Sequence, residues 1–203
     1  PPKVIDNIFS QNEINEFLKL YSELPLTVHN KKQNVIKKRW LQGFNTNLEK
    51  KFFDRVSKEI GHFKLDNLKD DNGKDIFGLI QESYNPIGLH VDAGFEINSQ
   101  IYKQTLIPLS SVGSTVIFKN RFYNGSTSFT QDPEELNKKN LTYGQNKRSD
   151  IHLKMFGNKP FDEKIHKKYL QHEKIENLKG LEVELIYEWK VGSILIFDRS
   201  HLH

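Results

Sequence analysis

Two short stretches of the chain hold residue types that bind metal ions. His90 and Asp92 stand two residues apart in "GLHVDAGF", and His201 and His203 close the sequence in "FDRSHLH". Residues two apart in an extended strand point to the same side, so the imidazole of His90 and the carboxylate of Asp92 can project together. With one further histidine they would form a set of two imidazoles and one carboxylate, which holds one face of an octahedral ion.

The His-x-Asp pattern is weak by itself, because a His and an Asp at the end of a turn can simply bond to the backbone. Its surroundings favour the metal interpretation. The pair follows a predicted strand that ends at Tyr84 and precedes another, "YKQTLIPLS", and the chain later returns through "WKVGSILIFDRSHLH". A two-His-one-carboxylate set leaves three positions of the ion open, as in non-haem Fe(II) oxygenases.

The elements that must position these residues change in type along the chain. Residues 1–75 are predicted to be mainly helical, because capping-box patterns at Ser10 and at Thr46 precede apolar residues at helical spacing. Those residues are Ile14, Phe17, Leu18 and Tyr21 in the first helix, and Leu48, Phe52, Val56 and Ile60 in the second. After residue 75, β-branched and aromatic residues predict strands at 76–84, 101–109, 114–123, 183–190 and 192–197.

A long polar insertion, residues 124–180, separates the two groups of predicted strands. It contains one helix start at Asp132-Pro133 and a second predicted helix from Phe161. Insertions of this length tend to be lids or binding elements, so we expect this one to cover a site. The histidines outside the two metal-binding stretches are predicted to be surface residues: His29, His62, His152, His166 and His172.

Helices followed by many short strands predict a single α+β domain over residues 1–203, built around a β-sandwich or jelly roll. The chain has no cysteine, which excludes disulfides and thiolate metal sites and favours the cytoplasm. We find no apolar run long enough to cross a membrane. The 30 basic and 26 acidic residues are spread along the chain, and no known motif frames the basic ones, so nucleic acid is not the expected partner.

Three stretches together resemble a known family: "ESYNPIGLHVDAG", "YKQTLIPLSSVGSTVIF" and "EWKVGSILIFDRSHLH". They are similar to the 2-oxoglutarate- and Fe(II)-dependent oxygenases, especially the prolyl-hydroxylase-like and phytanoyl-hydroxylase-like branches. The resemblance covers about residues 76–123 and 181–203 and implies a double-stranded β-helix, which is a cupin-like jelly roll. The N-terminal helices and the insertion lie outside it.

The resemblance implies an Fe(II)-dependent dioxygenase that hydroxylates a small molecule or a protein side chain and releases succinate and CO₂ from 2-oxoglutarate. His90 and Asp92 match the family's His-x-Asp, and the alignment makes His203 the distal metal ligand, with His201 as the alternative. The retained carboxylate of Asp92 favours hydroxylation, because related halogenases have a small residue at this position.

The resemblance also suggests residues for the cosubstrate. Tyr84 matches a position whose hydroxyl often contacts 2-oxoglutarate, and Tyr102 and Gln104 could contribute from the next strand, although Tyr102 could equally pack in the core. Lys103 is expected to point to the opposite side. The basic residue that anchors the far carboxylate is expected beyond residue 203, together with the last strand or strands.

Two other classes of function remain open from the sequence. The same three residues could hold a divalent metal in a cupin-like enzyme that does not use 2-oxoglutarate. The chain could also be a non-catalytic jelly-roll binding module. Nothing in the predicted substrate-facing regions selects one substrate.

Overall fold

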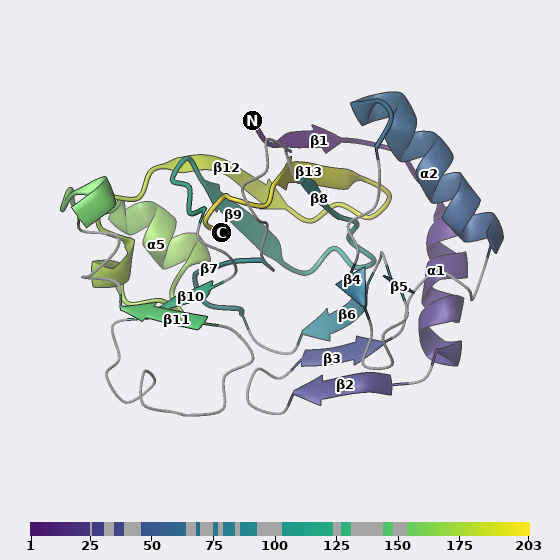
Figure 1. Ribbon diagram of the computed structural model, residues 1–203, viewed down its shortest axis with the longest axis horizontal. Helices are drawn as coiled ribbons and strands as arrows, with labels where there is room; N and C mark the ends of the chain where they lie inside the picture. Colours follow the sequence, from purple (N-terminus) through teal and green to yellow (C-terminus); the bar gives the residue numbers. More distant parts are fainter. Residues whose placement is uncertain are drawn as a thin grey trace. The chain divides into compact units, whose positions relative to one another are not determined.

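Helices and mainly antiparallel strands occur together in the computed structural model of the chain, so the α+β class is confirmed (Figure 1). The structure describes residues 1–24, 26–30, 35–38, 46–63, 68–69, 75–76, 79–83, 86–92, 103–123, 127–130, 144–147 and 154–203. No helix in this described part is long and apolar enough to span a membrane. The predicted helix start at Asp132 lies outside the described residues.

The chain divides into two compact units. The first unit consists of Pro1–Ile5, Gly88–Lys190 and Ile194–His203, and the second consists of Asp6–Ile87 and Val191–Ser193. The single domain over residues 1–203 stays a prediction. All residues of the candidate metal set belong to the first unit.

The described residues of the first unit form three small sheets, whose strands are labelled in Figure 1. In the first, β13 (Ile194–Asp198) pairs antiparallel with β1 (Lys3–Ile5) and β8 (Lys103–Leu106). The second joins β9 (Ser114–Phe118) to β12 (Val183–Glu188), and the third orders β11 (Gly144–Lys147), β10 (Thr127–Thr130) and β7 (His90–Val91). The four predicted strands between residues 101 and 197 are therefore confirmed, although β8, β9 and β12 end earlier than predicted.

Two apolar clusters cover the two faces of β9. Ile117 packs with Tyr187 of β12 and with Leu195 and Phe197 of β13, which joins two sheets face to face. Neighbouring side chains in a strand point to opposite faces, so Val116 and Phe118 enter a different cluster. Burial on both faces explains why "STVIF" contains a run of apolar residues without the polar alternation of a half-exposed strand.

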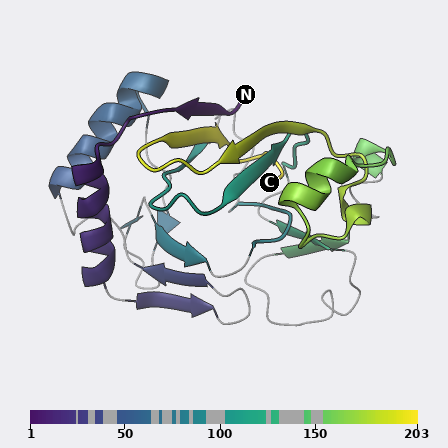
Figure 2. The same cartoon turned by 180° about the vertical axis from the view of Figure 1, so that it is seen from behind.

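The described C-terminal part of the insertion is built into the first unit. Helix α5 (Glu163–Tyr169) begins after Asp162, whose side chain accepts from the backbone N–H groups of Lys164 and Ile165, and the 3₁₀-helix η1 (Ile175–Leu178) follows. The predicted helix from Phe161 is thus confirmed, and it starts two residues later because Asp162 is its cap. Figure 2 shows α5 beside the β9–β12 pair. Its segment contributes Phe161, Leu170, Leu178 and Leu181 to the cluster that contains Phe118.

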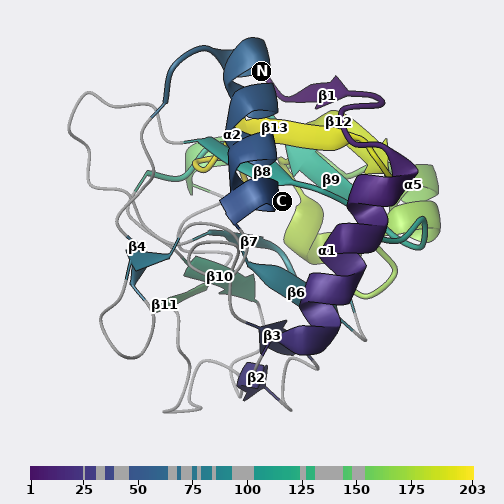
Figure 3. The same cartoon turned by 90° about the vertical axis from the view of Figure 1, so that its right-hand side faces the viewer.

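The second unit combines helices α1 (Gln11–Glu23) and α2 (Thr46–Ile60) with a ladder of β2 (Leu26–Asn30), β3 (Val35–Lys38) and β6 (Ile80–Ser83) (Figure 3). A two-stranded sheet, β4 (Leu68–Lys69) and β5 (Asp75–Ile76), completes it. The prediction that residues 1–75 are mainly helical is wrong in part. β2 pairs with β3, and β3 pairs in turn with β6 far along the chain, a contact that local propensity does not reveal.

Both predicted helices of the N-terminal part are present, and they differ from the prediction in which residues of α1 are buried. Ile14 and Phe17 are buried in α1 as predicted, but Leu18 is exposed and Leu20 takes its place in the core. Helix α2 begins at Thr46, where the second capping-box pattern predicted a helix start. His29 lies in β2 and not in a helical region.

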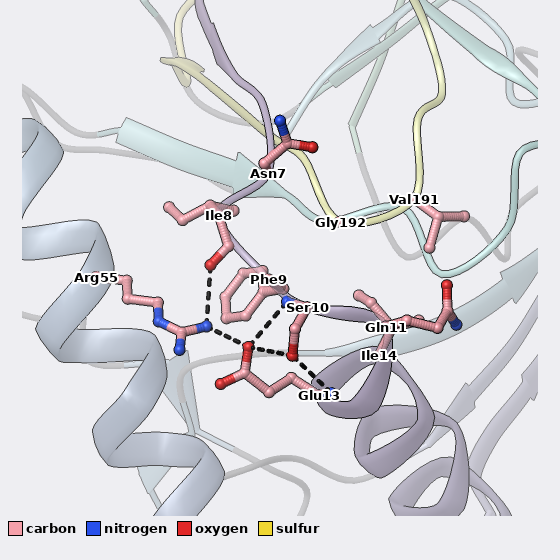
Figure 4. A pocket seen from close by; sticks show the side chains of 10 residues that line it. All are labelled: Asn7, Ile8, Phe9, Ser10, Gln11, Glu13, Ile14, Arg55, Val191 and Gly192. Atoms are coloured by element: carbon pink, nitrogen blue, oxygen red, sulfur yellow. Dashed lines mark hydrogen bonds and ion pairs between the residues drawn. The ribbon is translucent and has the colours of Figure 1, made fainter.

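A capping box starts α1, as predicted, and also connects it to α2 (Figure 4). The Ser10 hydroxyl accepts from the Glu13 N–H at 3.4 Å, and the Ser10 N–H donates to the Glu13 carboxylate at 2.9 Å. The same carboxylate accepts from the Arg55 guanidinium, which also donates to the Ile8 carbonyl at 2.9 Å. Because Glu13 is buried, this ion pair fixes the start of α1 against α2.

The Glu13 ion pair predicts a specific loss of stability in acid. The hydrogen bond from Arg55, followed by those from Ser10, lowers the pKa of Glu13 from 4.5 to about 2, although burial opposes the shift. The stabilisation is complete above the unfolded pKa of 4.5 and is lost as the pH falls through about 2. Arg55 is 34% exposed, so solvent screens the ion pair. We therefore expect the ion pair to contribute about 2 kcal/mol to the free energy of unfolding.

Urea unfolding between about pH 5 and pH 2 measures this contribution. The difference in free energy of unfolding between wild type and Glu13→Gln is expected to shrink by about 2 kcal/mol over that range. Glu16→Gln is the matched control, because Glu16 lies on the same helix as Glu13 and forms an exposed ion pair with Lys51 of α2. A difference that stays constant with pH would contradict the role given to Glu13.

Candidate metal centre

Strand β7 and the C-terminal residues place His90 and His203 directly opposite each other. The His90 N–H donates to the His203 carbonyl and the His203 N–H donates to the His90 carbonyl, both at 3.0 Å. Opposite residues of such an antiparallel pair project to the same side of the sheet. The two imidazole rings accordingly lie 4.3 Å apart between centroids.

The other edge of the C-terminal segment is also hydrogen-bonded. Phe118 donates its N–H to the Leu202 carbonyl at 3.0 Å, and Leu202 donates to the Asn120 carbonyl at 3.1 Å. The Leu202 side chain is fully buried and packs in one cluster with Leu89 and Val91. The apolar residues on either side of His90 and His203 therefore anchor both strands, while the histidines project from the other face.

Three potential ligand atoms converge at this face. His90 Nε2 lies 3.5 Å from Asp92 Oδ1, and His203 Nε2 lies 3.4 Å from Asp92 Oδ2. The ligand atoms of all three residues lie within 4.8 Å of one another. Two ligands at about 2.1 Å from one ion are about 3.0 Å apart at a right angle and about 3.4 Å apart at the tetrahedral angle, so the spacing suits one metal ion.

Backbone carbonyls orient both imidazoles. His90 Nδ1 lies 2.8 Å from the Gly88 carbonyl oxygen, and His203 Nδ1 lies 3.1 Å from the His201 carbonyl oxygen. A carbonyl can only accept, so each Nδ1 carries the hydrogen and each neutral ring presents the Nε2 lone pair. Histidines that bind metals are held in this way, with the second ring N–H donated to a carbonyl or carboxylate.

The charges at the site favour an ionised Asp92. Burial raises the pKa of Asp92, but hydrogen bonds from the protonated, imidazolium forms of His203 and His90 outweigh it and hold the pKa well below its usual value. Burial lowers the pKa of His90, yet Asp92, the Gly88 carbonyl and the Glu173 carboxylate together raise it above its usual value. The converging lone pairs and the carboxylate thus attract a cation, which is either a proton or a metal ion.

The site is open to solvent on the Asp92 side. The Asp92 side chain is 41% exposed, against 20% for His90 and 8% for His203. On the opposite side, the buried ring of Phe197 lies 5.1 Å from the His203 ring, edge to face. A small molecule could reach the ligand atoms past Asp92, whereas Phe197 excludes water behind His203.

His201 is not part of this cluster. It is fully buried, with Nδ1 2.7 Å from the Phe118 carbonyl oxygen and 3.4 Å from Glu184 Oε2. Its Nε2 has no hydrogen-bond partner in the described part of the chain. Of the two closing histidines, the structure therefore brings His203 to His90 and Asp92, and it places His201 in the interior.

The predicted cosubstrate residues are placed only in part. Gln104 pairs in register with Phe197, so its half-buried side chain projects to the face that borders His203. Lys103 projects to the other face, as expected, and bonds there to Asp198 at 2.7 Å. Tyr84 and Tyr102 lie outside the described residues.

Sequence reasoning missed two residues that touch the site. Phe197 lies against His203, and the Glu173 carboxylate accepts from the Leu89 N–H next to His90 at 2.8 Å. His166, predicted to be a surface residue, is half-buried and bonds to the Glu173 carbonyl at 2.8 Å, so that prediction is wrong. The two residues of the Glu173–Leu89 contact are 84 positions apart in the sequence, so no local sequence pattern predicts it.

A cleft of about 620 Å³ in the second unit offers no comparable chemistry (Figure 4). Arg55 and Glu13 line it, but they bond to each other and to the start of α1. None of His90, Asp92 and His203 lines this cleft.

Comparisons with protein families, with curated proteins and with solved structures find no match to this chain. The chemistry of the centre must therefore be inferred from its own geometry. The geometry is that of two imidazole Nε2 atoms and one carboxylate that face a common point.

Matched asparagine variants test which closing histidine binds metal. Asparagine keeps a donor near the position of Nδ1 and removes Nε2, so His203→Asn and His201→Asn retain their bonds to backbone carbonyls. We expect His203→Asn to lose Mn²⁺ binding in calorimetry by at least about tenfold and His201→Asn to bind as wild type does. The reverse order would move the ligand from His203 to His201.

Proposed function

We propose that the chain is an Fe(II)- and 2-oxoglutarate-dependent dioxygenase that hydroxylates a small molecule or a protein side chain in the cytoplasm. The observation that carries this proposal is the convergence of His90 Nε2, His203 Nε2 and the Asp92 carboxylate within 4.8 Å. Two imidazoles and one carboxylate leave three positions of an octahedral ion open, which suits a chelating cosubstrate and dioxygen. The sequence resemblance around the same residues supports the choice of Fe(II).

We also propose that the strands of the first unit form a double-stranded β-helix. Two antiparallel sheets pack face to face through Ile117, Leu195 and Phe197, which supports a sandwich of the jelly-roll type. The candidate ligands stand on β7 and just after β13, so they come from strands far apart in the chain. A jelly roll brings such strands together at one end of the sandwich.

In this proposal His90, Asp92 and His203 would hold the metal ion. Bound Fe(II) with 2-oxoglutarate would supply the activation of dioxygen, the oxidant, with one oxygen atom going to the substrate and the other to succinate, and with release of CO₂. The carbonyls of Gly88 and His201 accept from the two Nδ1 atoms, which would leave both Nε2 lone pairs for the ion. Phe197 packs on His203 and keeps water from that side of the ring.

Gln104 is the described candidate for contact with 2-oxoglutarate. Its register opposite Phe197 puts its amide, a donor and acceptor, on the side of the sheet that borders His203. Tyr84 and Tyr102 stay as predicted cosubstrate residues.

Loss of Asp92 tests the proposed reaction. Asp92→Ala removes the one anionic ligand, so we expect 2-oxoglutarate-dependent release of succinate to fall by at least about a hundredfold. The assay supplies Fe(II), ascorbate and 2-oxoglutarate to the purified chain. Glu182→Gln is the control, because Glu182 forms an exposed ion pair with Lys119.

The outcomes separate the proposed dioxygenase from the other two classes. Succinate release by Asp92→Ala at the wild-type rate would rule out the dioxygenase. Metal binding by wild type without any response to 2-oxoglutarate would favour a cupin-like metal enzyme. Absence of metal binding in wild type would favour a non-catalytic module.

A further inference from the structure

The Glu173 side chain reaches from the insertion to the strand that bears His90. Glu173 lies in the turn between α5 and η1, and its Oε1 accepts from the Leu89 N–H at 2.8 Å. Leu89 directly precedes His90 and is buried in the cluster to which α5 and η1 also contribute. The contact therefore joins the insertion to the metal-bearing strand at a packed position.

One peptide group connects the Glu173 carboxylate to the His90 ring. The N–H of the Gly88–Leu89 peptide donates to Glu173 Oε1, and the carbonyl of the same peptide accepts from His90 Nδ1 at 2.8 Å. A hydrogen bond to an anion polarises the peptide and makes its carbonyl a stronger acceptor. A stronger acceptor at Nδ1 increases the electron density that the ring offers at Nε2.

The Glu173 carboxylate is held in place from several sides. Asn177, buried in η1, donates from Nδ2 to Glu173 Oε2 at 3.2 Å. The Glu173 N–H donates to the Leu170 carbonyl at 3.0 Å, and His166 Nε2 lies 2.8 Å from the Glu173 carbonyl oxygen. These bonds fix both the backbone and the carboxylate, so the contact with Leu89 is a defined one.

Gly88 provides the room for this approach. A Cβ atom added at Gly88 would lie 2.8 Å from Glu173 Oε1, closer than real Cβ contacts allow. The obstructing atom is the end of a side chain, so alanine at this position would displace the carboxylate and leave its charge in the molecule. Gly88 and Glu173 thus offer two independent ways to disturb the same bond.

We infer that Glu173 is a positioning residue for His90, acting through the Gly88–Leu89 peptide to orient the imidazole and to strengthen Nε2 as a metal ligand. This inference rests on the proposed metal centre. It gives the described C-terminal part of the insertion a role in the site that is separate from covering it.

Metal affinity of the purified chain tests the inference without any turnover. Mn²⁺ is titrated by calorimetry into wild type, Glu173→Gln, Gly88→Ala, Asp92→Ala and the control Glu188→Gln. Glutamine keeps the shape and an acceptor for Leu89 but removes the charge, and Glu188 forms an exposed ion pair with Lys168. We expect about tenfold weaker Mn²⁺ binding in Glu173→Gln and in Gly88→Ala, and wild-type binding in the control.

A spectroscopic readout separates positioning from mere stabilisation. The ¹⁵N shifts of the His90 ring in the metal-free chain report which ring nitrogen carries the hydrogen. In wild type we expect the Nδ1–H form, and in Glu173→Gln a mixture of the two tautomers. A residue that only stabilised the turn would change the unfolding temperature and leave these shifts as in wild type.

The outcomes distinguish a failure of the role given to Glu173 from a failure of the proposed metal centre. Wild-type Mn²⁺ affinity and unchanged His90 shifts in Glu173→Gln would overturn the role of Glu173 and leave the metal centre intact, provided that Asp92→Ala loses Mn²⁺. Failure of wild type itself to bind Mn²⁺ would instead overturn the proposed centre, and the inference with it.

Discussion

The two backbone hydrogen bonds between His90 and His203 are the constraint on which the candidate centre depends. They set the register in which both imidazoles share one face, while Leu89, Val91 and Leu202 share the buried face. A slip of one residue would turn the histidines into the core and the leucines out to the site. The burial of these three apolar side chains therefore specifies the site as firmly as the polar groups do.

Backbone groups dominate the support of this centre. The carbonyls of Gly88 and His201 hold the rings, and the N–H of Leu89 receives the Glu173 carboxylate. Such groups are available at any sequence, provided that the strands pair correctly. The geometry of the ligands is therefore a consequence of strand register and of close packing, and few side chains have to be specified for it.

The described part of the insertion shows how a polar segment can belong to a core. α5 and η1 look solvated in sequence, yet Leu170 and Leu178 pack with Leu89 in one cluster. The same packing brings Glu173 to the site. The sequence predicted that the insertion covers a site and that a helix begins near Phe161, which α5 confirms. It could not show which residues of the unit the segment would contact.

Local patterns were enough to predict several elements from the sequence alone. The capping box of Ser10 and Glu13 acts over three residues, the apolar runs of β9 and β13 reflect burial on both faces, and the two-residue period puts His90 and Asp92 on one side. Each of these patterns is formed by residues close together in the sequence. β1 and β3 were missed, because their partners β13 and β6 are distant in sequence.

The choice between His201 and His203 is the clearest case that the tertiary structure alone decided. Both residues have the same parity in an extended segment, so their spacing cannot distinguish them. Pairing with His90 brings His203 to Asp92, whereas His201 is buried and bonds to the Phe118 carbonyl. Sequence determined which residue types could bind a metal ion, and long-range strand pairing decided which of them meet, because that pairing is a property of the whole fold.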